Sequence, residues 1–287
     1  MTLRVDASKF VDEHLLWAGR SPATREGYAK DLRYFADYME RRYNGQVFTD
    51  EVTEEDVETY LHYLRAEKQL SLRTVGRYLS SLRSFYKYAC RRRLTVNDPT
   101  ALIKAPKVPR TLPVYLDEEE LTSLARAAQN PTIESIIWTL YLSGLRNGEL
   151  CSLKLADVDL GRRLVYVRRG KGSKDRVVPT SSRLAQVLER YLRLYRHDRK
   201  TAYFFTTRSG KICTSYVTKC IKEAAQKAGI QKKVSAHTLR HSFATALYRK
   251  GVGILEISVL LGHESVETTQ VYTHLAGGEL QKAVEVL

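Results

Sequence analysis

The sequence lacks the features that mark exported, disulfide-bonded or membrane-spanning proteins. Its 287 residues include four cysteines, scattered without a C-x-x-C pair, and this usage is typical of reduced thiols in a cytosol. No run of about 18 apolar residues occurs, and the N-terminus has no apolar stretch of the signal-peptide kind. We therefore expect a soluble, cytoplasmic protein that does not contact a membrane and keeps its cysteines as core filler. They are Cys90, Cys151, Cys213 and Cys220.

Motifs for metal and nucleotide binding are also missing. No acidic cluster suggests two-metal nuclease chemistry. A P-loop needs a glycine five residues before its Gly-Lys pair and a serine or threonine after it, but Val165 and Gly172 stand there. His237 and His241 have the i, i+4 spacing of a zinc site, yet Thr238 replaces the glutamate of a zincin. The sequence predicts neither a metal nor a cofactor.

Positive charge is what the chain has in excess. It carries 47 lysines and arginines against 32 acidic residues, a formal net charge of +15. Such a surplus favours a polyanionic partner. On charge alone, nucleic acid ranks first as this partner and an anionic membrane surface second, and we expect nucleic acid and no membrane.

The first third of the chain, residues 1–100, has helical periodicity from Val5 to about Asp98. Ser21-Pro22 and the segment Thr53 to Asp56 mark helix starts. In Ser71 to Arg93 one stripe of apolar residues is surrounded by basic ones. The stripe consists of Val75, Leu79, Leu82 and Tyr86. We predict a small helical DNA-binding bundle, and its predicted DNA contacts are Arg73, Arg77, Arg83 and Lys87.

A connector follows at residues 101–113. The stretch 97–113 holds four prolines and three basic residues, which suits an extended, positively charged linker. We place the domain boundary here and predict that Lys104 and Lys107 contact DNA.

Residues 114–287 predict a second, α+β domain. Asp117 and Glu120 have the spacing of a helix-capping pair. The expected helices are 118–128, 133–143 and further helices from Ser215 onward. The expected strands are 164–168 and 176–179, joined by a turn with Gly170 and Gly172, and a third strand at 202–206. The whole chain is therefore predicted to be mainly α, with a small antiparallel β-sheet.

Four motifs occur in this second domain in a fixed order. They are S-G-L-R-N-G-E-L at 143–150, G-K-G-S-K-D-R at 170–176, H-T-L-R-H at 237–241, and L-L-G-H at 260–263 followed nine residues later by a tyrosine. Together they resemble the tyrosine recombinase (phage integrase) family, in detail over the second two-thirds of the chain and in pattern only over the first third. The resemblance implies six catalytic residues: Arg146, Lys171, His237, Arg240, His263 and Tyr272.

These residue types suit the cleavage of a phosphodiester by a protein nucleophile. Such chemistry needs a nucleophile, positive charge on the non-bridging oxygens and a proton for the leaving oxygen. Arg146 and Arg240 are candidate phosphate clamps, because a guanidinium stays charged and its fork matches two oxygens. His237 lies three residues before Arg240, so on a helix both project to one side. Tyr272 attacks well only where a base or concentrated positive charge favours its phenolate. His263 can donate a hydrogen bond to a phosphate oxygen or assist proton transfer.

Several assignments stay open at this level. The family pattern places the general acid at Lys171, with Lys174 as a rival, and the turn can instead be a basic hairpin that only touches phosphate. Lys174 and Arg176 are predicted DNA contacts. Glu149 either orients a neighbour or forms an ordinary salt bridge or cap. His241 is expected to point away from the Arg240 face and to be structural.

The resemblance also implies a fold and a reaction. The N-terminal helices form a SAM-like core-binding domain, and the two domains clamp double-stranded DNA at an inverted-repeat core site. Cleavage gives a 3′-phosphotyrosyl link, and strand exchange proceeds through a Holliday junction without metal or ATP. A dimer occupies each site and a tetramer joins two sites, on the nucleoid of a bacterium or archaeon. The biological role is dimer resolution, cointegrate resolution, integration or excision.

Three questions remain at the level of sequence. A type IB topoisomerase-like enzyme shares the chemistry, although the separate helical domain and proline-rich linker favour a recombinase. A DNA-binding protein without catalysis is the third class, for which the full residue set would be superfluous. Residues 280–287 have an amphipathic helical pattern, and this segment docks either on a neighbouring subunit or on its own domain.

Overall fold

The computed structural model describes residues 1–109, 113–168, 175–196 and 200–262. The chain divides into two compact units, Met1–Arg110 and Thr111–Leu287, and each is described by itself. The finer boundaries expected at residues 100 and 114 stay a prediction.

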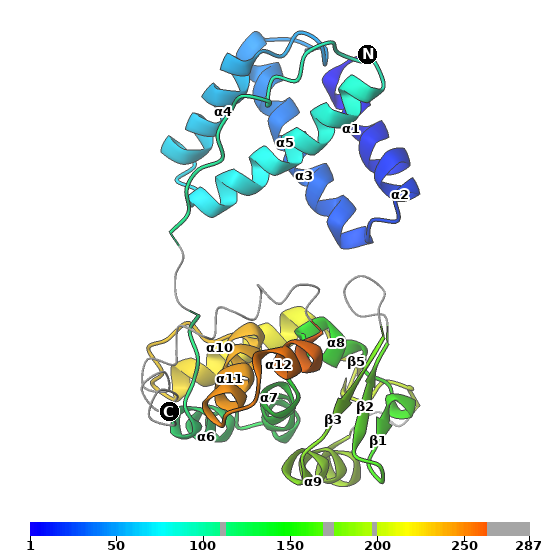
Figure 1. The fold of residues 1–287 in the computed structure, drawn as a ribbon, viewed down its shortest axis with the longest axis vertical. Coiled ribbons are helices and arrows are strands. Elements are labelled where there is room, and N and C mark those ends of the chain that lie inside the picture. The colour runs from blue at the N-terminus through cyan, green and yellow to red at the C-terminus, as the bar shows by residue number, and fades with distance from the viewer. Residues whose placement is uncertain (110–112, 169–174, 197–199, 263–287) are drawn as a thin grey trace, which may run out of the picture. The chain divides into compact units, whose positions relative to one another are not determined.

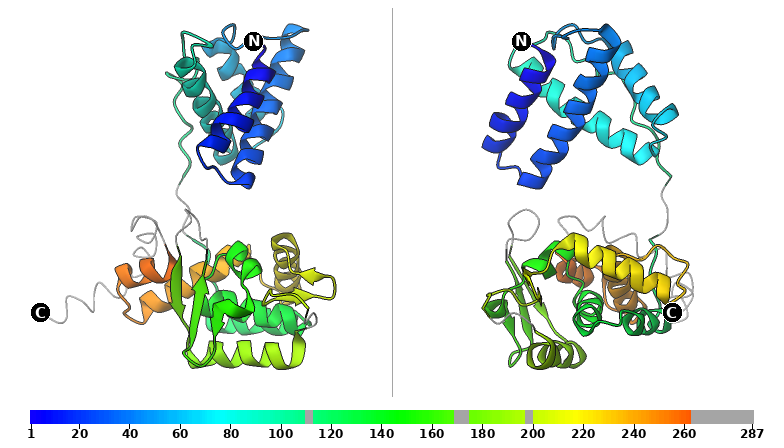
Figure 2. Two further views of the ribbon diagram at one scale, coloured as in Figure 1. Left: turned by 90° about the vertical axis from the view of Figure 1, so that its right-hand side faces the viewer. Right: turned by 180° about the vertical axis from the view of Figure 1, so that it is seen from behind.

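The first unit is built from helices (Figure 1). The first helical stretch comprises α1 (Leu3–Lys9), the π-helical turn η1 (Phe10–His14) and α2 (Leu15–Trp17), and it is followed by α3 (Pro22–Tyr43), α4 (Glu54–Ala66) and α5 (Leu72–Arg91). The predicted starts are confirmed. The Ser21 hydroxyl accepts the N–H of Thr24, and Thr53 and Asp56 form a reciprocal capping box. Helix α3 contacts both α1 and α5 (Figure 2).

The apolar stripe of α5 forms part of the core of this unit. All four predicted stripe residues are buried, which confirms the 3.6-residue period as the signal for this helix. The chain after α5 returns along the same helix (Figure 1). There Arg83 donates a hydrogen bond to the carbonyl oxygen of Ile103, and Pro106 lies beside Gly76. Part of the predicted linker is therefore attached to α5.

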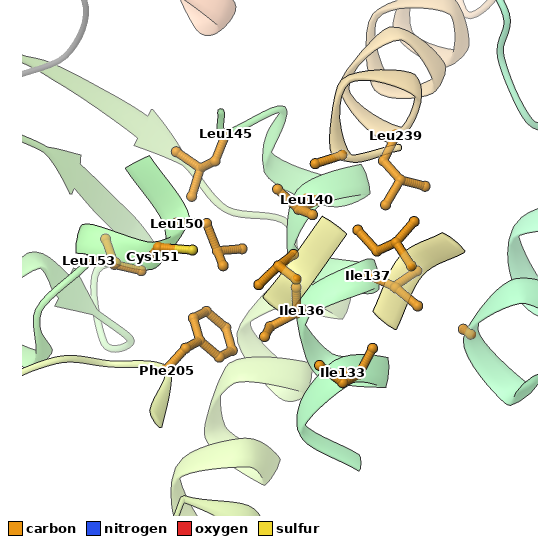
Figure 3. Packing of buried hydrophobic residues seen from close by; sticks show 14 of the residues in the cluster. Ile133, Ile136, Ile137, Leu140, Leu145, Leu150, Cys151, Leu153, Phe205 and Leu239 are labelled. Atoms are coloured by element: carbon orange, nitrogen blue, oxygen red, sulfur yellow. The ribbon is translucent and has the colours of Figure 1, made fainter. Parts of the chain in front are cut away.

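The second unit is centred on α7 (Pro131–Ser143). The other helices are α6 (Glu118–Ala127), α8 (Asn147–Ser152), α9 (Ser182–Arg190), the π-helical turn η4 (Tyr191–Tyr195), α10 (Thr214–Lys227), α11 (Ala236–Arg249) and α12 (Ile254–Leu261). Helix α7 contacts α6, α8, α9, α10 and α11. Its Ile133, Ile136, Ile137 and Leu140 are buried, and Figure 3 shows them packed with Leu150, Phe205 and Leu239. A helix that is apolar on most sides is expected at such a central place.

A three-stranded antiparallel sheet lies beside these helices. It has the order β1 (Val158–Asp159), β2 (Leu164–Val167) and β3 (Arg176–Pro179), with the short 3-10 turn η2 (Leu155–Asp157) before it. Val167 pairs with Arg176 at the end of the ladder next to the β2–β3 turn. The predicted strands 164–168 and 176–179 are confirmed to within one residue.

Three expectations for this unit were wrong or incomplete. The third strand was expected at 202–206, but within this range only an isolated antiparallel bridge forms, between Tyr203 and Lys154. Strand β4 (Thr206–Thr207) begins at the end of the range and forms a small hairpin with β5 (Gly210–Lys211). Phe204 and Phe205 before it are buried core residues. Helix α9 was not predicted. Cys213 is exposed rather than core filler, whereas Cys151 is buried as expected.

Candidate active site

The first arginine motif occupies a tight turn between α7 and α8. Gly144 ends α7 with φ +62°, and a Cβ there would lie 2.5 Å from Cδ1 of Phe243 on α11. Only glycine satisfies both the left-handed backbone and the close packing. The turn then buries Leu145 and places Arg146 immediately before α8.

Glu149 joins two arginines from distant parts of the chain. Its carboxylate accepts the backbone N–H of Arg146 at 2.8 Å and Nη1 of the same residue at 2.7 Å. Arg176, the first residue of β3, donates Nη1 and Nη2 to the two oxygens at 2.8 and 2.7 Å. Burial opposes ionisation of Glu149, but the hydrogen bonds from Arg176 and the Arg146 backbone outweigh it and lower its pKa to about 2. Both roles considered for Glu149, cap and orienting partner, are thus combined in one side chain.

Arg240 is the most deeply buried of the arginines at this site, with 2% of its surface exposed. Its Nη1 donates to the carbonyl oxygen of Gly144 at 2.5 Å, and its Nη2 to that of Leu261 at 2.6 Å. A buried guanidinium requires such acceptors, because an uncompensated buried charge is strongly destabilising.

The C-terminal end of α12 is where the three arginines meet. Its last carbonyl oxygens accept one bond each: Leu260 from Arg176 Nε at 3.2 Å, Leu261 from Arg240, and Gly262 from Arg146 Nη2 at 2.9 Å. The final carbonyls of a helix carry partial negative charge and have no intrahelical donor. Three cations therefore satisfy the helix end immediately before residue 263.

His237 lies near these arginines on α11, one turn before Arg240. Burial lowers the pKa of His237 below its ordinary value, and the charges of Arg240 and Arg146 lower it further. The His241 ring lies against that of His237, with centroids 4.2 Å apart. The expectation that His241 points away was therefore wrong. Burial, and then the charges of His237 and Arg240, lower its pKa to about 4.

The structure thus brings Arg146, His237 and Arg240 together. The other three predicted catalytic residues, Lys171, His263 and Tyr272, lie outside the described residues. The predicted DNA contact Lys174 lies outside them as well. Within the described ranges, no group of three or more histidine, cysteine or acidic side chains is arranged to hold a metal ion. In the same part of the chain, no helix has the length and apolar character needed to cross a membrane.

The predicted DNA contacts fall into different environments. The side chains of Arg73, Lys87, Lys104 and Lys107 are exposed. Arg77 pairs with the buried Asp31 while half of its side chain remains exposed. Arg83 holds the chain after α5, as described above, and Arg176 is only 12% exposed. Sequence reasoning did not find the pairing of Glu149 with Arg176, because the two are 27 residues apart and on different elements.

Comparison with known proteins agrees with the family that the sequence motifs resemble. Residues 114–279 match the phage integrase family, and residues 9–93 match the phage integrase N-terminal SAM-like domain. A tyrosine recombinase of Thermosipho africanus is 35% identical over 93% of this chain and 94% of its own length. XerA of Pyrococcus furiosus is 33% identical over 99% of this chain and 94% of its own length.

Solved structures extend the comparison. XerA recombinase superposes with a TM-score of 0.55 at 35% identity, over 98% of this chain and 97% of its own. The Tn1549 transposon integrase in complex with a circular intermediate DNA shares the fold with a TM-score of 0.77 at 19% identity, over 99% of each chain. The chain belongs to the phage integrase family of tyrosine recombinases, enzymes that cut and rejoin DNA strands.

Proposed function

We propose that this enzyme is a site-specific recombinase in which Tyr272 attacks a DNA phosphate and Arg146, His237 and Arg240 stabilise the reacting group. The observation that supports this most directly is the convergence of Arg146 and Arg240 on the end of α12. Tyr272 follows Leu261, the last residue of this helix, by eleven positions.

The proposed cleavage step balances as a phosphoryl transfer. The phenolate oxygen of Tyr272 forms a bond to phosphorus, and the bond from phosphorus to the 5′ oxygen breaks. Lys171 donates a proton to that leaving oxygen, with Lys174 as the alternative donor. The 3′ phosphate stays on the enzyme, and the 5′ hydroxyl of a partner strand reverses the step. The bond energy is retained, so the step consumes no ATP.

Arg146 and Arg240 stabilise the charge that develops on the non-bridging oxygens. Among the described residues Arg146 donates two side-chain hydrogen bonds, whereas a guanidinium has five N–H donors. Donor capacity therefore remains for a phosphate. The lowered pKa of His237 favours a neutral imidazole at neutral pH, which can donate or accept one hydrogen bond at the reacting phosphate together with His263.

The proposed substrate is double-stranded DNA with an inverted-repeat core site, bound by a dimer and joined to a second site in a tetramer with a Holliday junction intermediate. The names of the relatives support the DNA partner and the dimer on one site: Xer recombinases, and a lambda integrase dimer bound to a core site. The N-terminal unit contributes the contacts of Arg73, Arg77 and Lys87 to the backbone of the duplex. The setting is the nucleoid in the cytoplasm of a bacterium or archaeon.

The segment 280–287 is proposed to dock on a neighbouring subunit and to couple the active sites. Deleting residues 279–287 should reduce tetramer assembly and recombination. Full recombination with normal assembly after the deletion would reject docking in trans and favour packing on its own domain.

A covalent-trapping experiment tests the proposed chemistry. A duplex that the protein selects from a random pool is nicked near the cleavage position, so that the cut fragment diffuses away, and incubated with enzyme in EDTA. We expect a protein–DNA adduct with the wild type and with Tyr216→Phe, an exposed control tyrosine on α10, and none with Tyr272→Phe. No wild-type adduct on a verified site would contradict catalysis.

Recombination and relaxation are then separated on plasmids. A plasmid with two copies of the selected site should give deletion or inversion products. Relaxed circles without recombinant products would favour the type IB topoisomerase-like alternative. Binding without either product would favour a DNA-binding protein without catalysis.

A further inference from the structure

We propose that Arg176 is a positioning residue for the phosphate clamp, one that acts through Glu149 and the end of α12 rather than by contacting DNA. The proposal rests on the proposed roles of Arg146 and Tyr272. It replaces the expectation that Arg176 is one of several basic residues along a DNA-facing hairpin.

The contacts of Arg176 carry the inference. Each nitrogen of its guanidinium has a protein acceptor: Nη1 and Nη2 bind the two oxygens of Glu149, and Nε binds the carbonyl oxygen of Leu260. A planar guanidinium matches a carboxylate in this bidentate way, whereas lysine provides a single point charge. With its side chain 12% exposed, Arg176 is directed into the protein.

Gly262 gives a second, independent observation. It adopts φ +62°, and a Cβ at this position would lie 2.8 Å from Cδ of Arg176. The side chain of Arg176 is therefore packed against the backbone of the residue just before His263. The same side chain thus fixes Glu149, which holds Arg146, and the helix end from which the chain continues toward Tyr272.

The consequence is a mechanical link between three parts of the chain. Arg176 begins β3 and is paired with Val167 across the hairpin, so the sheet supports its backbone. Through Glu149 it sets the position of Arg146, and through Leu260 and Gly262 it sets the end of α12. A displacement of about 1 Å at a reacting centre can cost about 10²-fold in rate, so loss of this link should affect cleavage more than binding.

The test uses Arg176→Lys and Arg176→Ala with Arg168→Ala as the matched control. Arg168 follows the paired strand β2, and its exposed guanidinium forms an ion pair with the buried carboxylate of Asp157. Single-turnover adduct formation is measured on the selected duplex at saturating enzyme, and DNA affinity is measured at several salt concentrations. We expect about 10²-fold slower adduct formation for both Arg176 variants, unchanged affinity and salt dependence, and wild-type behaviour for Arg168→Ala. Thermal melting checks that each variant is folded. If Arg176→Ala does not fold, the milder variant Arg176→Lys decides the test.

Two further measurements distinguish the route of action. In a Glu149→Gln background, Arg176→Lys should add little further loss, because its partner has already been changed. A substrate with sulfur in place of the bridging 5′ oxygen needs no proton donor, and it should not rescue Arg176→Lys.

Four results would overturn the proposal. Weaker DNA binding by the Arg176 variants with a smaller salt dependence would indicate a phosphate contact. Rescue of Arg176→Lys by the sulfur substrate would indicate action through the general acid. The other two results are full additivity of the cleavage losses of Arg176→Lys and Glu149→Gln, and unchanged cleavage by the Arg176 variants. Absence of a wild-type adduct would reject the proposed function, and with it the reaction that Arg176 serves. An active wild type with an equally active Arg176→Lys would reject this inference alone.

Discussion

The two units of the molecule use arginine in opposite ways. In the N-terminal unit, Arg77 pairs with a buried aspartate, yet half of its side chain is exposed. In the catalytic unit, Arg240 is almost completely buried and bonded to backbone carbonyls. The first arrangement leaves a charge at the surface, and the second fixes a charge in position.

The two arrangements suit two tasks: exposed charges attract DNA, and buried, hydrogen-bonded charges hold fixed positions. Exposed charges interact with DNA over a distance that salt screens, and their removal costs little protein stability. A buried arginine must keep its acceptors or destabilise the fold. Changes at the buried arginines of the catalytic unit should therefore alter cleavage and stability together, whereas changes at an exposed residue such as Arg73 should alter binding alone. Arg77→Ala should in addition lower stability, because it leaves the buried Asp31 without its ion pair.

The largest effect is expected for Arg240→Ala. The substitution removes a proposed phosphate ligand and leaves the Gly144 and Leu261 carbonyls without this donor, so adduct formation should fall by about 10³-fold and the melting temperature should also fall. Arg249→Ala, an exposed arginine on the same helix, is the control and should retain activity. Near-normal cleavage by Arg240→Ala would remove the distinction between the two units.

The difference in unfolding free energy between wild type and Glu149→Gln, measured as a function of pH, tests the lowered pKa of the Glu149 carboxyl. The folded-state pKa is lowered from 4.5 to about 2, so its contribution is fully present above pH 4.5 and is lost as the pH falls toward 2. The shift corresponds to roughly 3 kcal/mol. Denaturant unfolding should show the variant less stable at pH 7, with the difference from wild type shrinking between pH 4.5 and 2. A difference that does not change with pH would contradict the ion-pair account.

Gly144→Ala tests the packing that places Arg146. The added Cβ meets Phe243 and also strains a left-handed backbone, and we expect a loss of about 3 kcal/mol in unfolding free energy. Gly229→Ala is the matched control, because Gly229 has φ +68° with nothing within 4 Å of its Cβ position. Its loss should be about 1 kcal/mol, from backbone strain only. Equal losses would show that the contact with α11 is unimportant.

The smallest effect is expected at the exposed arginines. Arg73→Ala and Arg77→Ala should each weaken DNA binding by about tenfold at moderate salt and reduce the salt slope by about one, without abolishing cleavage. Arg4→Ala provides a control, because Arg4 pairs with Asp37 and Glu40 on the same unit. Binding that does not depend on salt would contradict the role assigned to this unit.

Local patterns accounted for the parts of the fold that depend on neighbours in sequence. The period of the α5 stripe, the caps at Ser21, Thr53 and Asp117, and strands β2 and β3 were all predictable. The third strand was misplaced because the buried aromatics Phe204 and Phe205 resemble a strand when tertiary packing is unknown.

In the candidate site, too, the sequence predicts local features but not long-range contacts. The motifs identified Arg146, His237 and Arg240, since each motif is local. The bonds that organise them, from Arg176 to Glu149 and from three arginines to the end of α12, join residues 21 to 116 positions apart. No local period or motif encodes such pairings, so they emerged only from the folded chain.

The central claim is that Tyr272 becomes covalently attached to the 3′ phosphate of the cleaved DNA. The most direct measurement is to trap the adduct on the nicked duplex, digest both protein and DNA, and locate the modified residue by mass spectrometry. We predict one peptide containing Tyr272 that carries a nucleotide through a 3′-phosphotyrosyl bond. Attachment at another residue, or through a 5′ phosphate, would contradict it.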